Sequence, residues 1–252
     1  MRTDQIALQL YTMREAAKDD LLGTLTRVAE AGYRTVEFAG FHGVAPAQIR
    51  ATLDKHGIRA MGAHVQLSEF ETRLDGVLTD LQTLGCDYAI VPGLPEDRRG
   101  AETVPALAAA FNEIGARCQE SGLRFAYHNH AFEFEIRDAA GATFWELLVA
   151  ATDPGSISFE LDAYWVQFAG YNPVTIIDSL AGRVPLLHLK DMDPTDRTKD
   201  APFGEGSLPW PPILAAAGRA GVAWYVVEQD LPRDPLEDIT TSLRNAEKMT
   251  RA

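Results

Sequence analysis

Two histidines and two carboxylates in the second half of the chain are spaced in a way that suits a metal ion. They are, in chain order, His128, Asp162, His188 and Glu228. Each ends a short apolar run, and they are separated by 34, 26 and 40 residues, close to the length of one strand–helix unit. Imidazole with carboxylate suits manganese, zinc, iron or cobalt better than magnesium. We therefore expect one divalent ion here, with manganese as the first choice and zinc, cobalt, iron or magnesium as alternatives.

A reaction at such an ion also needs a group that moves a proton. Lys190 lies two residues after His188, so both side chains would leave a strand on the same face, whereas Asp191 would point the other way, toward a structural partner. His130 and Glu133 lie at or just beyond the end of the fifth apolar run. The residues that we expect to be catalytic are Glu228, His130, Lys190 and Glu133.

Further polar and aromatic residues at the ends of apolar runs are candidates for substrate binding. Glu37 ends the second run, and there it would either transfer a proton or form an ion pair at the rim of the barrel. His64 ends the third run and would bind a hydroxyl or remain a core histidine. Tryptophan rings stack on sugar faces or pack in the core. The expected substrate-binding residues are Glu37, His64, Trp165 and Trp210.

These residues are positioned by eight short apolar runs that alternate with longer amphipathic segments. Several of the runs are apolar on both faces, which is typical of parallel strands covered by helices. Five amphipathic segments end at a glycine and are followed within a few residues by an apolar run, as in helix–strand connections. Residues 132–135 alternate Phe and Glu, which favours a hairpin-like extension. The expected strands span 6–10, 35–39, 59–65, 88–93, 124–130, 156–162, 184–191 and 223–230.

The chain of 252 residues predicts an α/β protein that forms one (β/α)₈ (TIM) barrel over residues 1–252. An open doubly wound sheet is the main alternative, but the GxGxxG turn that usually follows its first strand is absent. Residues 192–210 form the longest irregular stretch, after the seventh strand, on the face where barrel enzymes carry their working loops. Side chains at the C-terminal ends of barrel strands share one pocket, so the candidate residues should meet there.

The composition and charge of the chain indicate which kinds of partner and which location to expect. The net charge of −13 disfavours nucleic acid and anionic membranes. We see no apolar run long enough for a membrane span and no secretory signal. Cys86 and Cys118 form no CxxC pair, which indicates reduced thiols and a cytoplasmic protein. The sequence leaves open whether the chain acts alone, as a homo-oligomer or with a partner subunit.

Several motifs together resemble the xylose isomerase-like TIM barrel family, whose members are often called sugar phosphate isomerases/epimerases. The resemblance covers nearly the whole chain. It is carried by QLYTMR (9–14), GYRTVEFAG (32–40), YHNHAFEFE (127–135), ELDAYW (160–165), LHLKDM (187–192), GEGSLPW (204–210) and VEQD (227–230).

The resemblance implies one metal held by residues from strands five to eight, namely His128, Asp162, His188 and Glu228. His128 departs from the family pattern, because many members have Glu at this position. In sugar epimerases of the family, that Glu and the eighth-strand Glu are thought to share the proton transfers. The departure puts two-base epimerisation in doubt but leaves the metal site intact, since imidazole is an equally good ligand.

Our leading hypothesis is a metal-dependent isomerase or epimerase that acts on a sugar or hydroxyketone through a metal-stabilised enediolate. The alternative is a lyase or dehydratase of a keto-sugar or 3-keto-glycoside, which loses a β-substituent from the same species. Two further hypotheses are an endonuclease-like phosphodiesterase, which the charge disfavours, and a non-catalytic binding module. In the first two cases the partner is a small-molecule sugar or keto-sugar.

Overall fold

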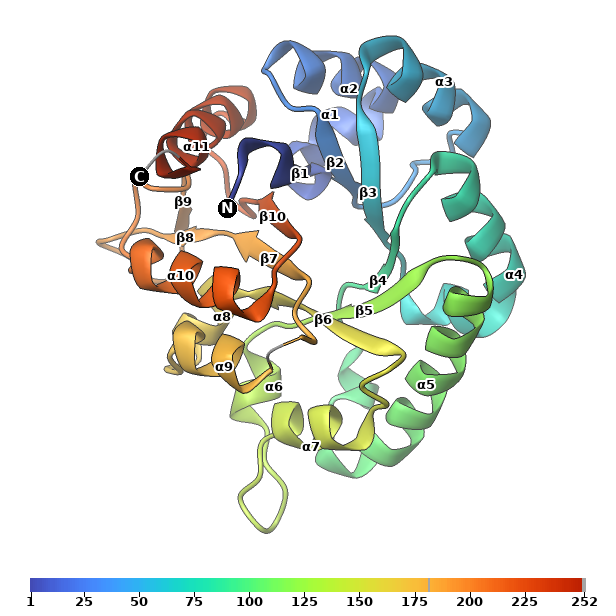
Figure 1. Ribbon diagram of the computed structural model, residues 1–252, viewed down its shortest axis with the longest axis vertical. Coiled ribbons are helices and arrows are strands. Elements are labelled where there is room, and N and C mark those ends of the chain that lie inside the picture. The colour runs from blue at the N-terminus through green and yellow to red at the C-terminus, as the bar shows by residue number, and fades with distance from the viewer. Residues whose placement is uncertain (181, 251–252) are drawn as a thin grey trace.

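The computed structural model describes residues 1–180 and 182–250, and eight parallel strands in it form a closed barrel. Helices surround the strands (Figure 1). The strands are β1 (Ile6–Gln9), β2 (Thr35–Phe38), β3 (Arg59–His64), β4 (Tyr88–Val91), β5 (Arg124–His128), β6 (Ile157–Asp162), β7 (Leu186–Leu189) and β10 (Trp224–Val227). They pair in the order β1, β10, β7, β6, β5, β4, β3, β2, which closes the circle. The predicted (β/α)₈ barrel is therefore confirmed.

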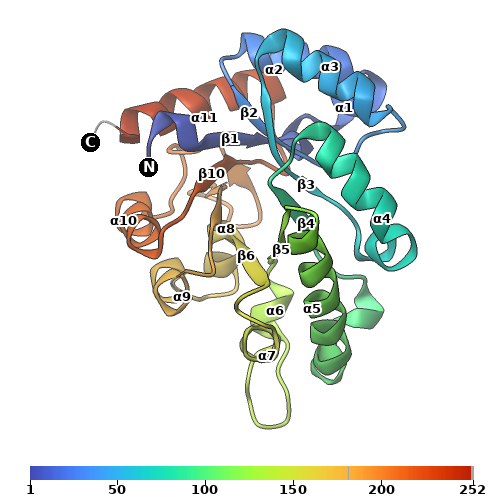
Figure 2. The same cartoon turned by 45° about the vertical axis from the view of Figure 1, so that its right-hand side comes forward.

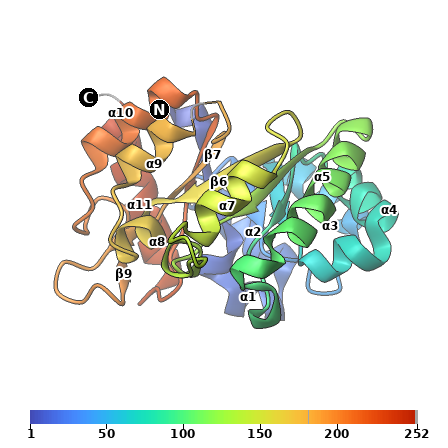
Figure 3. The same cartoon turned by 90° about the horizontal axis from the view of Figure 1, so that it is seen from below.

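The helices connect consecutive strands and form the outer layer. They are α1 (Arg14–Asp19), α2 (Leu21–Glu30), α3 (Pro46–His56), α4 (Leu67–Leu84), α5 (Val104–Glu120), α6 (Phe132–Glu135), α7 (Phe144–Ala151), α8 (Ala163–Phe168), α9 (Pro173–Ser179), α10 (Trp210–Ala220) and α11 (Pro235–Thr250). The last helix returns beside the N-terminal segment, where the Thr3 and Thr250 hydroxyls lie 3.4 Å apart (Figure 2). Seen from below, α9, α10 and α11 lie on one side of the barrel and α3, α4 and α5 on the other (Figure 3). Within the described ranges, no helix is long and apolar enough to cross a membrane.

The glycines that the sequence analysis placed at helix ends do end the helices. Gly57 follows α3 and Gly85 follows α4, with φ angles of 64° and 72°. This left-handed conformation is disfavoured for residues with a Cβ, so glycine lets the chain turn directly from helix to strand. At the N-terminal end of α2, the Asp20 carboxylate accepts a hydrogen bond of 2.9 Å from the backbone N–H of Gly23.

Three local expectations need correction. The fifth strand ends at His128, so His130 lies in the following loop rather than in the strand. Residues 132–135 form the short helix α6, not a hairpin-like extension, because Phe134 is buried against Trp145 and Tyr171 while the backbone closes a helical turn. The irregular stretch after β7 contains a small antiparallel pair formed by β8 (Asp191–Met192) and β9 (Asp200–Ala201).

The barrel interior has an apolar lower layer and a polar upper layer. The lower layer consists of Ala7, Met61, Tyr88, Ile90, Ala126, Leu186 and Val226. Two residues further along four of these strands come polar residues: Gln9, His128, His188 and Glu228. Side chains two residues apart share one face of a strand. The alternation that fills the barrel with apolar groups thus also brings the polar groups together at its C-terminal end.

Candidate metal centre and active site

The four expected metal ligands come from four strand ends and are all buried. Asp162, His188 and Glu228 each offer one ligand atom, and these three atoms lie within 4.8 Å of one another. Nδ1 of His188 lies 2.9 Å from Oε2 of Glu228. Nε2 of His128 lies 4.0 Å from Oδ2 of Asp162. The structure therefore brings the four residues into one cluster.

One oxygen of Asp162 is available as a ligand for a divalent cation. Oδ1 of Asp162 accepts hydrogen bonds from the backbone N–H groups of Tyr164 (2.8 Å) and Trp165 (3.3 Å), at the start of α8. The buried Oδ2 has no hydrogen-bond partner in the described part of the chain. Burial raises the pKa of Asp162 to about 7, and a cation beside Oδ2 would lower it. The two carboxylates and two imidazoles form a donor set that zinc, manganese, iron or cobalt accepts.

Beneath this cluster lies Glu160, which the sequence analysis did not single out. Its Oε2 lies 3.1 Å from Nδ1 of His128 and 3.2 Å from Nε2 of His188. The other nitrogen of His128 lies near Asp162, and the other nitrogen of His188 lies near Glu228. A carboxylate such as Glu160 on one nitrogen fixes the orientation of a metal-binding histidine. Glu160 lies two residues before Asp162 in the same strand, so strand alternation was the signal that could have identified it.

Glu37 and His64 extend the same buried network. Nε2 of His64 lies 2.7 Å from Glu160 and 3.2 Å from Glu37, and Gln9 donates a hydrogen bond of 2.5 Å to Glu37. Burial opposes the charge on His64, yet Glu37 and Glu160 together raise its pKa to about 10. His64 lines the cavity described below, as expected of a substrate-binding residue. Glu37 is fully buried beneath the ligands and does not reach the cavity, so it supports the site rather than contacting substrate.

Lys190 shares the face of His188, as the two-residue spacing predicted. Its Nζ lies 3.8 Å from Oδ2 of Asp162 and 3.6 Å from Oε2 of Glu228, and it forms its shortest contact with Asp230. Burial disfavours the ammonium ion, but Glu228, Asp162 and Asp230 outweigh burial and raise the pKa of Lys190. The ammonium therefore lies at the edge of the metal cluster with its charge retained.

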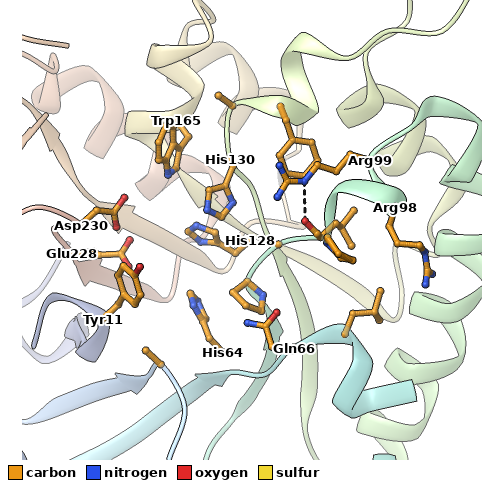
Figure 4. A pocket seen from close by; sticks show the side chains of 18 of the residues that line it. Tyr11, His64, Gln66, Arg98, Arg99, His128, His130, Trp165, Glu228 and Asp230 are labelled. Atoms are coloured by element: carbon orange, nitrogen blue, oxygen red, sulfur yellow. Dashed lines mark hydrogen bonds between the residues drawn. The ribbon is translucent and has the colours of Figure 1, made fainter. Parts of the chain in front are cut away.

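His130 and Trp165 form the adjoining wall of the cavity (Figure 4). The centroid of the His130 ring lies 5.5 Å from that of Trp165 and 5.1 Å from that of His128. Nδ1 of His130 and Nε1 of Trp165 are both shielded from solvent and have no hydrogen-bond partner among the residues that the structure describes. Burial, reinforced by the nearby Lys190 ammonium, lowers the pKa of His130 to about 3. The His130 and Trp165 side chains thus line the cavity while these two nitrogens lie inside the wall.

The structure does not bring Glu133 or Trp210 to the cavity, which corrects the expected catalytic and substrate-binding roles. Glu133 is fully buried, where its carboxylate accepts hydrogen bonds from the Tyr127 hydroxyl (2.6 Å) and the backbone N–H of His130 (2.9 Å). Burial raises the pKa of Glu133 to about 7. Trp210 is buried too, and its Nε1 donates a hydrogen bond of 2.8 Å to Asp191. Both residues hold loops in place.

A cavity of about 940 Å³ opens above the cluster. Its inner wall carries His64, His128, His130, Lys190 and Glu228. The outer wall carries Leu94, Arg98, Arg99 and Phe132, across the cavity from Glu228 and Asp230 (Figure 4). A large pocket in which several polar groups converge at one end is typical of a small-molecule binding site.

Comparison with known proteins agrees with this architecture. Inosose dehydratase from Geobacillus kaustophilus is 27% identical over 191 residues, which cover 67% of this chain and 61% of that protein. The match thus spans less than two thirds of that relative's length. A sugar phosphate isomerase/epimerase from Parabacteroides distasonis superposes with a TM-score of 0.84 at 24% identity, over 96% of this chain and 93% of that chain.

A second solved structure, described as the IOLI protein with a binding zinc atom, superposes with a TM-score of 0.75 at 16% identity, over 98% of both chains. Structural likeness at such low identity establishes the fold alone. The model of one protein family, however, matches residues 25–249, which is most of the sequence. The chain therefore belongs to the xylose isomerase-like TIM barrel family.

Proposed function

We propose that the protein is a metal-dependent lyase of the dehydratase type. It removes water or an alcohol from the carbon β to the ketone of a keto-sugar or a cyclic polyhydroxyketone. The observation that carries this proposal is the convergence of two imidazoles and two carboxylates beside the Lys190 ammonium and the unpartnered His130. Curated relatives that bear the name inosose dehydratase support the lyase over an isomerase.

The residue at the end of the fifth strand also favours elimination. In sugar epimerases of the family that the chain resembles, a glutamate there and the eighth-strand glutamate are thought to share the proton transfers. Here the position is His128, whose Nδ1 is bonded to Glu160 at 3.1 Å. That nitrogen is therefore not free to move a proton at the substrate, and the second carboxylate of a two-base mechanism is missing from this position.

The site residues have separate roles in the proposed reaction. When bound by His128, Asp162, His188 and Glu228, a divalent ion would supply Lewis-acid polarisation of the substrate carbonyl, and zinc or manganese suits this donor set. The imidazole of His130, which lines the cavity, accepts the proton from the carbon next to the ketone. As the β C–O bond breaks, the departing oxygen takes that proton back and leaves as water or alcohol. Lys190 and Trp165 hold substrate oxygens in place.

Product analysis tests the proposal. The protein is loaded with manganese or zinc and incubated with a panel of inososes, 3-keto-glucosides, ketoses and aldoses, and the products are identified by mass spectrometry and NMR. Elimination lowers the mass by one water or releases an alcohol, whereas isomerisation or epimerisation leaves the mass unchanged. We expect elimination in the wild type and a loss of at least about 100-fold in kcat for His130→Gln. Conversion without a change in mass would replace the lyase by an isomerase.

A further inference from the structure

The outer wall of the cavity has a chemical character of its own. At about 940 Å³, the cavity is near the upper end of the roughly 300–1,000 Å³ that hold drug-sized ligands. A single sugar ring at the metal cluster would leave the space beside Leu94, Arg99 and Phe132 unfilled. Figure 4 shows Arg98 and Arg99 across this space from Glu228 and Asp230. The cavity is also lined by Glu71 and Glu135, so the partners of each arginine decide where positive charge remains.

The two neighbouring arginines differ in their partners. Nη1 of Arg98 lies 3.1 Å from Oε1 of Glu71, a normal ion pair. Arg99 forms no ion pair within the described part of the chain. Its Nε donates a hydrogen bond of 2.8 Å to the backbone oxygen of Leu94, and its guanidinium carbon lies 4.4 Å from the centroid of the Phe132 ring. These two contacts fix the guanidinium plane, and within residues 1–180 and 182–250 neither terminal amino group has an acceptor.

An arginine without an acidic partner is unexpected in this protein. The chain has 36 acidic and 23 basic residues, so carboxylates are in excess. The buried Glu133 does not form a salt bridge with Arg99, because its oxygens accept from the Tyr127 hydroxyl and the His130 N–H instead. The guanidinium is thus held rigidly, faces the cavity and lacks the oxygens that an arginine normally binds.

We propose that Arg99 binds an anionic oxygen group of the substrate, either a carboxylate or a phosphate, while the keto-sugar end lies at the metal cluster. A guanidinium with two free amino groups in one plane matches two oxygens of either group. The apolar Leu94 and Phe132 beside it exclude water and strengthen the pairing. This inference rests on the proposed function, since it assigns the other end of the same substrate.

The experiment compares Arg99→Met with Arg98→Met, two adjacent substitutions in the same cavity wall. Inorganic phosphate and benzoate are titrated separately into chelator-stripped protein at low ionic strength, and binding is measured by isothermal titration calorimetry. We expect Arg99→Met to weaken binding of at least one anion about tenfold or more, the scale of one charge-assisted interaction. Arg98→Met should change it less than about twofold, because Glu71 already neutralises Arg98.

Each outcome decides the proposal. Loss of phosphate binding in Arg99→Met supports a phosphorylated substrate, and loss of benzoate binding supports a carboxylate. Equal losses in both variants, or none in either, would overturn it. Arg99→Lys keeps the charge without the planar pair of donors and should give an intermediate loss, which keeps the test usable if Arg99→Met does not fold. Because the titration needs neither metal nor turnover, its failure is distinguishable from failure of the lyase assay.

Discussion

Glu160 shows how much of the site depends on a residue that does not touch the substrate. Its Oε2 lies within 3.2 Å of nitrogens of His64, His128 and His188, while Oε1 has no hydrogen-bond partner among the described residues. A carboxylate on the far nitrogen of a metal-binding imidazole fixes the ring and makes the other nitrogen more basic. Here one carboxylate does this for both candidate imidazole ligands.

We therefore expect Glu160→Gln to weaken zinc or manganese affinity roughly 10- to 100-fold, the usual effect of losing such a partner. Affinity is measured by competition with a fluorescent chelator. Glu135→Gln is the matched control, because Glu135 lines the same cavity without contacting the imidazoles. Equal affinities for Glu160→Gln and the wild type would show that the network does not position the ligands.

Gly93 is a second positioning residue, in the loop after β4. Its φ is 151°, and a Cβ at this position would lie 3.3 Å from Cε1 and 3.4 Å from Nδ1 of His130. The absence of a side chain thus lets the imidazole lie against the backbone. Any larger residue would have to displace the ring that the proposed reaction uses.

Gly93→Ala should lower kcat roughly 3- to 10-fold, because contacts of 3.3 and 3.4 Å move the His130 ring by a few tenths of an ångström, less than the displacement of about 1 Å that costs roughly 100-fold. The control is Gly122→Ala, which has a positive φ of 74° and nothing within 4 Å of the added Cβ. Both variants should lose about 1 kcal/mol of stability from backbone strain. Steady-state kinetics and the NMR signal of the His130 ring are measured, and equal activity in the two variants would contradict the positioning role.

At the scale of elements, Asp191 organises the long connection after β7. Its buried carboxylate accepts hydrogen bonds from the backbone N–H groups of Gly204 (3.0 Å), Gly206 (3.1 Å) and Leu208 (3.1 Å) and from Nε1 of Trp210 (2.8 Å). This confirms the expectation that Asp191 points away from the pocket toward a structural partner. The GEGSLPW motif thus folds around one carboxylate.

Asp191→Ala would leave several buried donors unpaired, each at a cost of roughly 1–3 kcal/mol. We expect a loss of at least about 3 kcal/mol in the free energy of unfolding, measured by urea denaturation. Asp196→Ala removes a carboxylate from an exposed turn of the same connection and should cost about 1 kcal/mol or less. Similar losses in the two variants would mean that Asp191 does not organise the connection.

The sequence was informative where one physical rule governs a whole element. Alternating apolar strands and amphipathic helices predicted the barrel, because a parallel sheet must be covered by helices. The spacing also predicted that His128, Asp162, His188 and Glu228 converge, because residues at the C-terminal ends of barrel strands meet in one pocket. Glu160 lies two residues before Asp162 on the same face of β6, so strand alternation marks its position too, although it lies inside the strand rather than at its end.

The residues after strand ends were harder to predict. Glu133 and Trp210 lie in segments where the chain changes direction, and neither alternation nor helical periodicity fixes where their side chains point. The chain turns into α6 after His130, and this turn buries Glu133. Trp210 begins α10 and faces Phe203 and Asp191. Such orientations follow from tertiary packing, which a single sequence does not reveal.

At the scale of the whole molecule, the buried cluster couples metal binding to stability. Asp162, Glu228 and Asp230 surround only one ammonium, that of Lys190, and repulsion among them contributes to the raised pKa values of Asp162 and Asp230, for which burial is the main cause. A divalent ion bound by the native state would offset this repulsion, whereas the unfolded chain offers no preformed site. Metal binding should therefore stabilise the barrel as a whole.

At a metal concentration of about 100 times Kd, linkage predicts a gain of roughly 2.7 kcal/mol, which corresponds to a rise in Tm of about 5–10 °C for a chain of this size. Differential scanning calorimetry with zinc, manganese or excess chelator measures the shift at fixed protein concentration. Asp162→Asn is the control: its side-chain oxygen still accepts the Tyr164 and Trp165 N–H groups, while the negative charge at the ligand position is removed, so the metal-free form should not be strongly destabilised and its response to metal should fall sharply. A metal-induced rise in Tm that survives unchanged in Asp162→Asn would place the ion elsewhere and remove the basis of the proposed lyase.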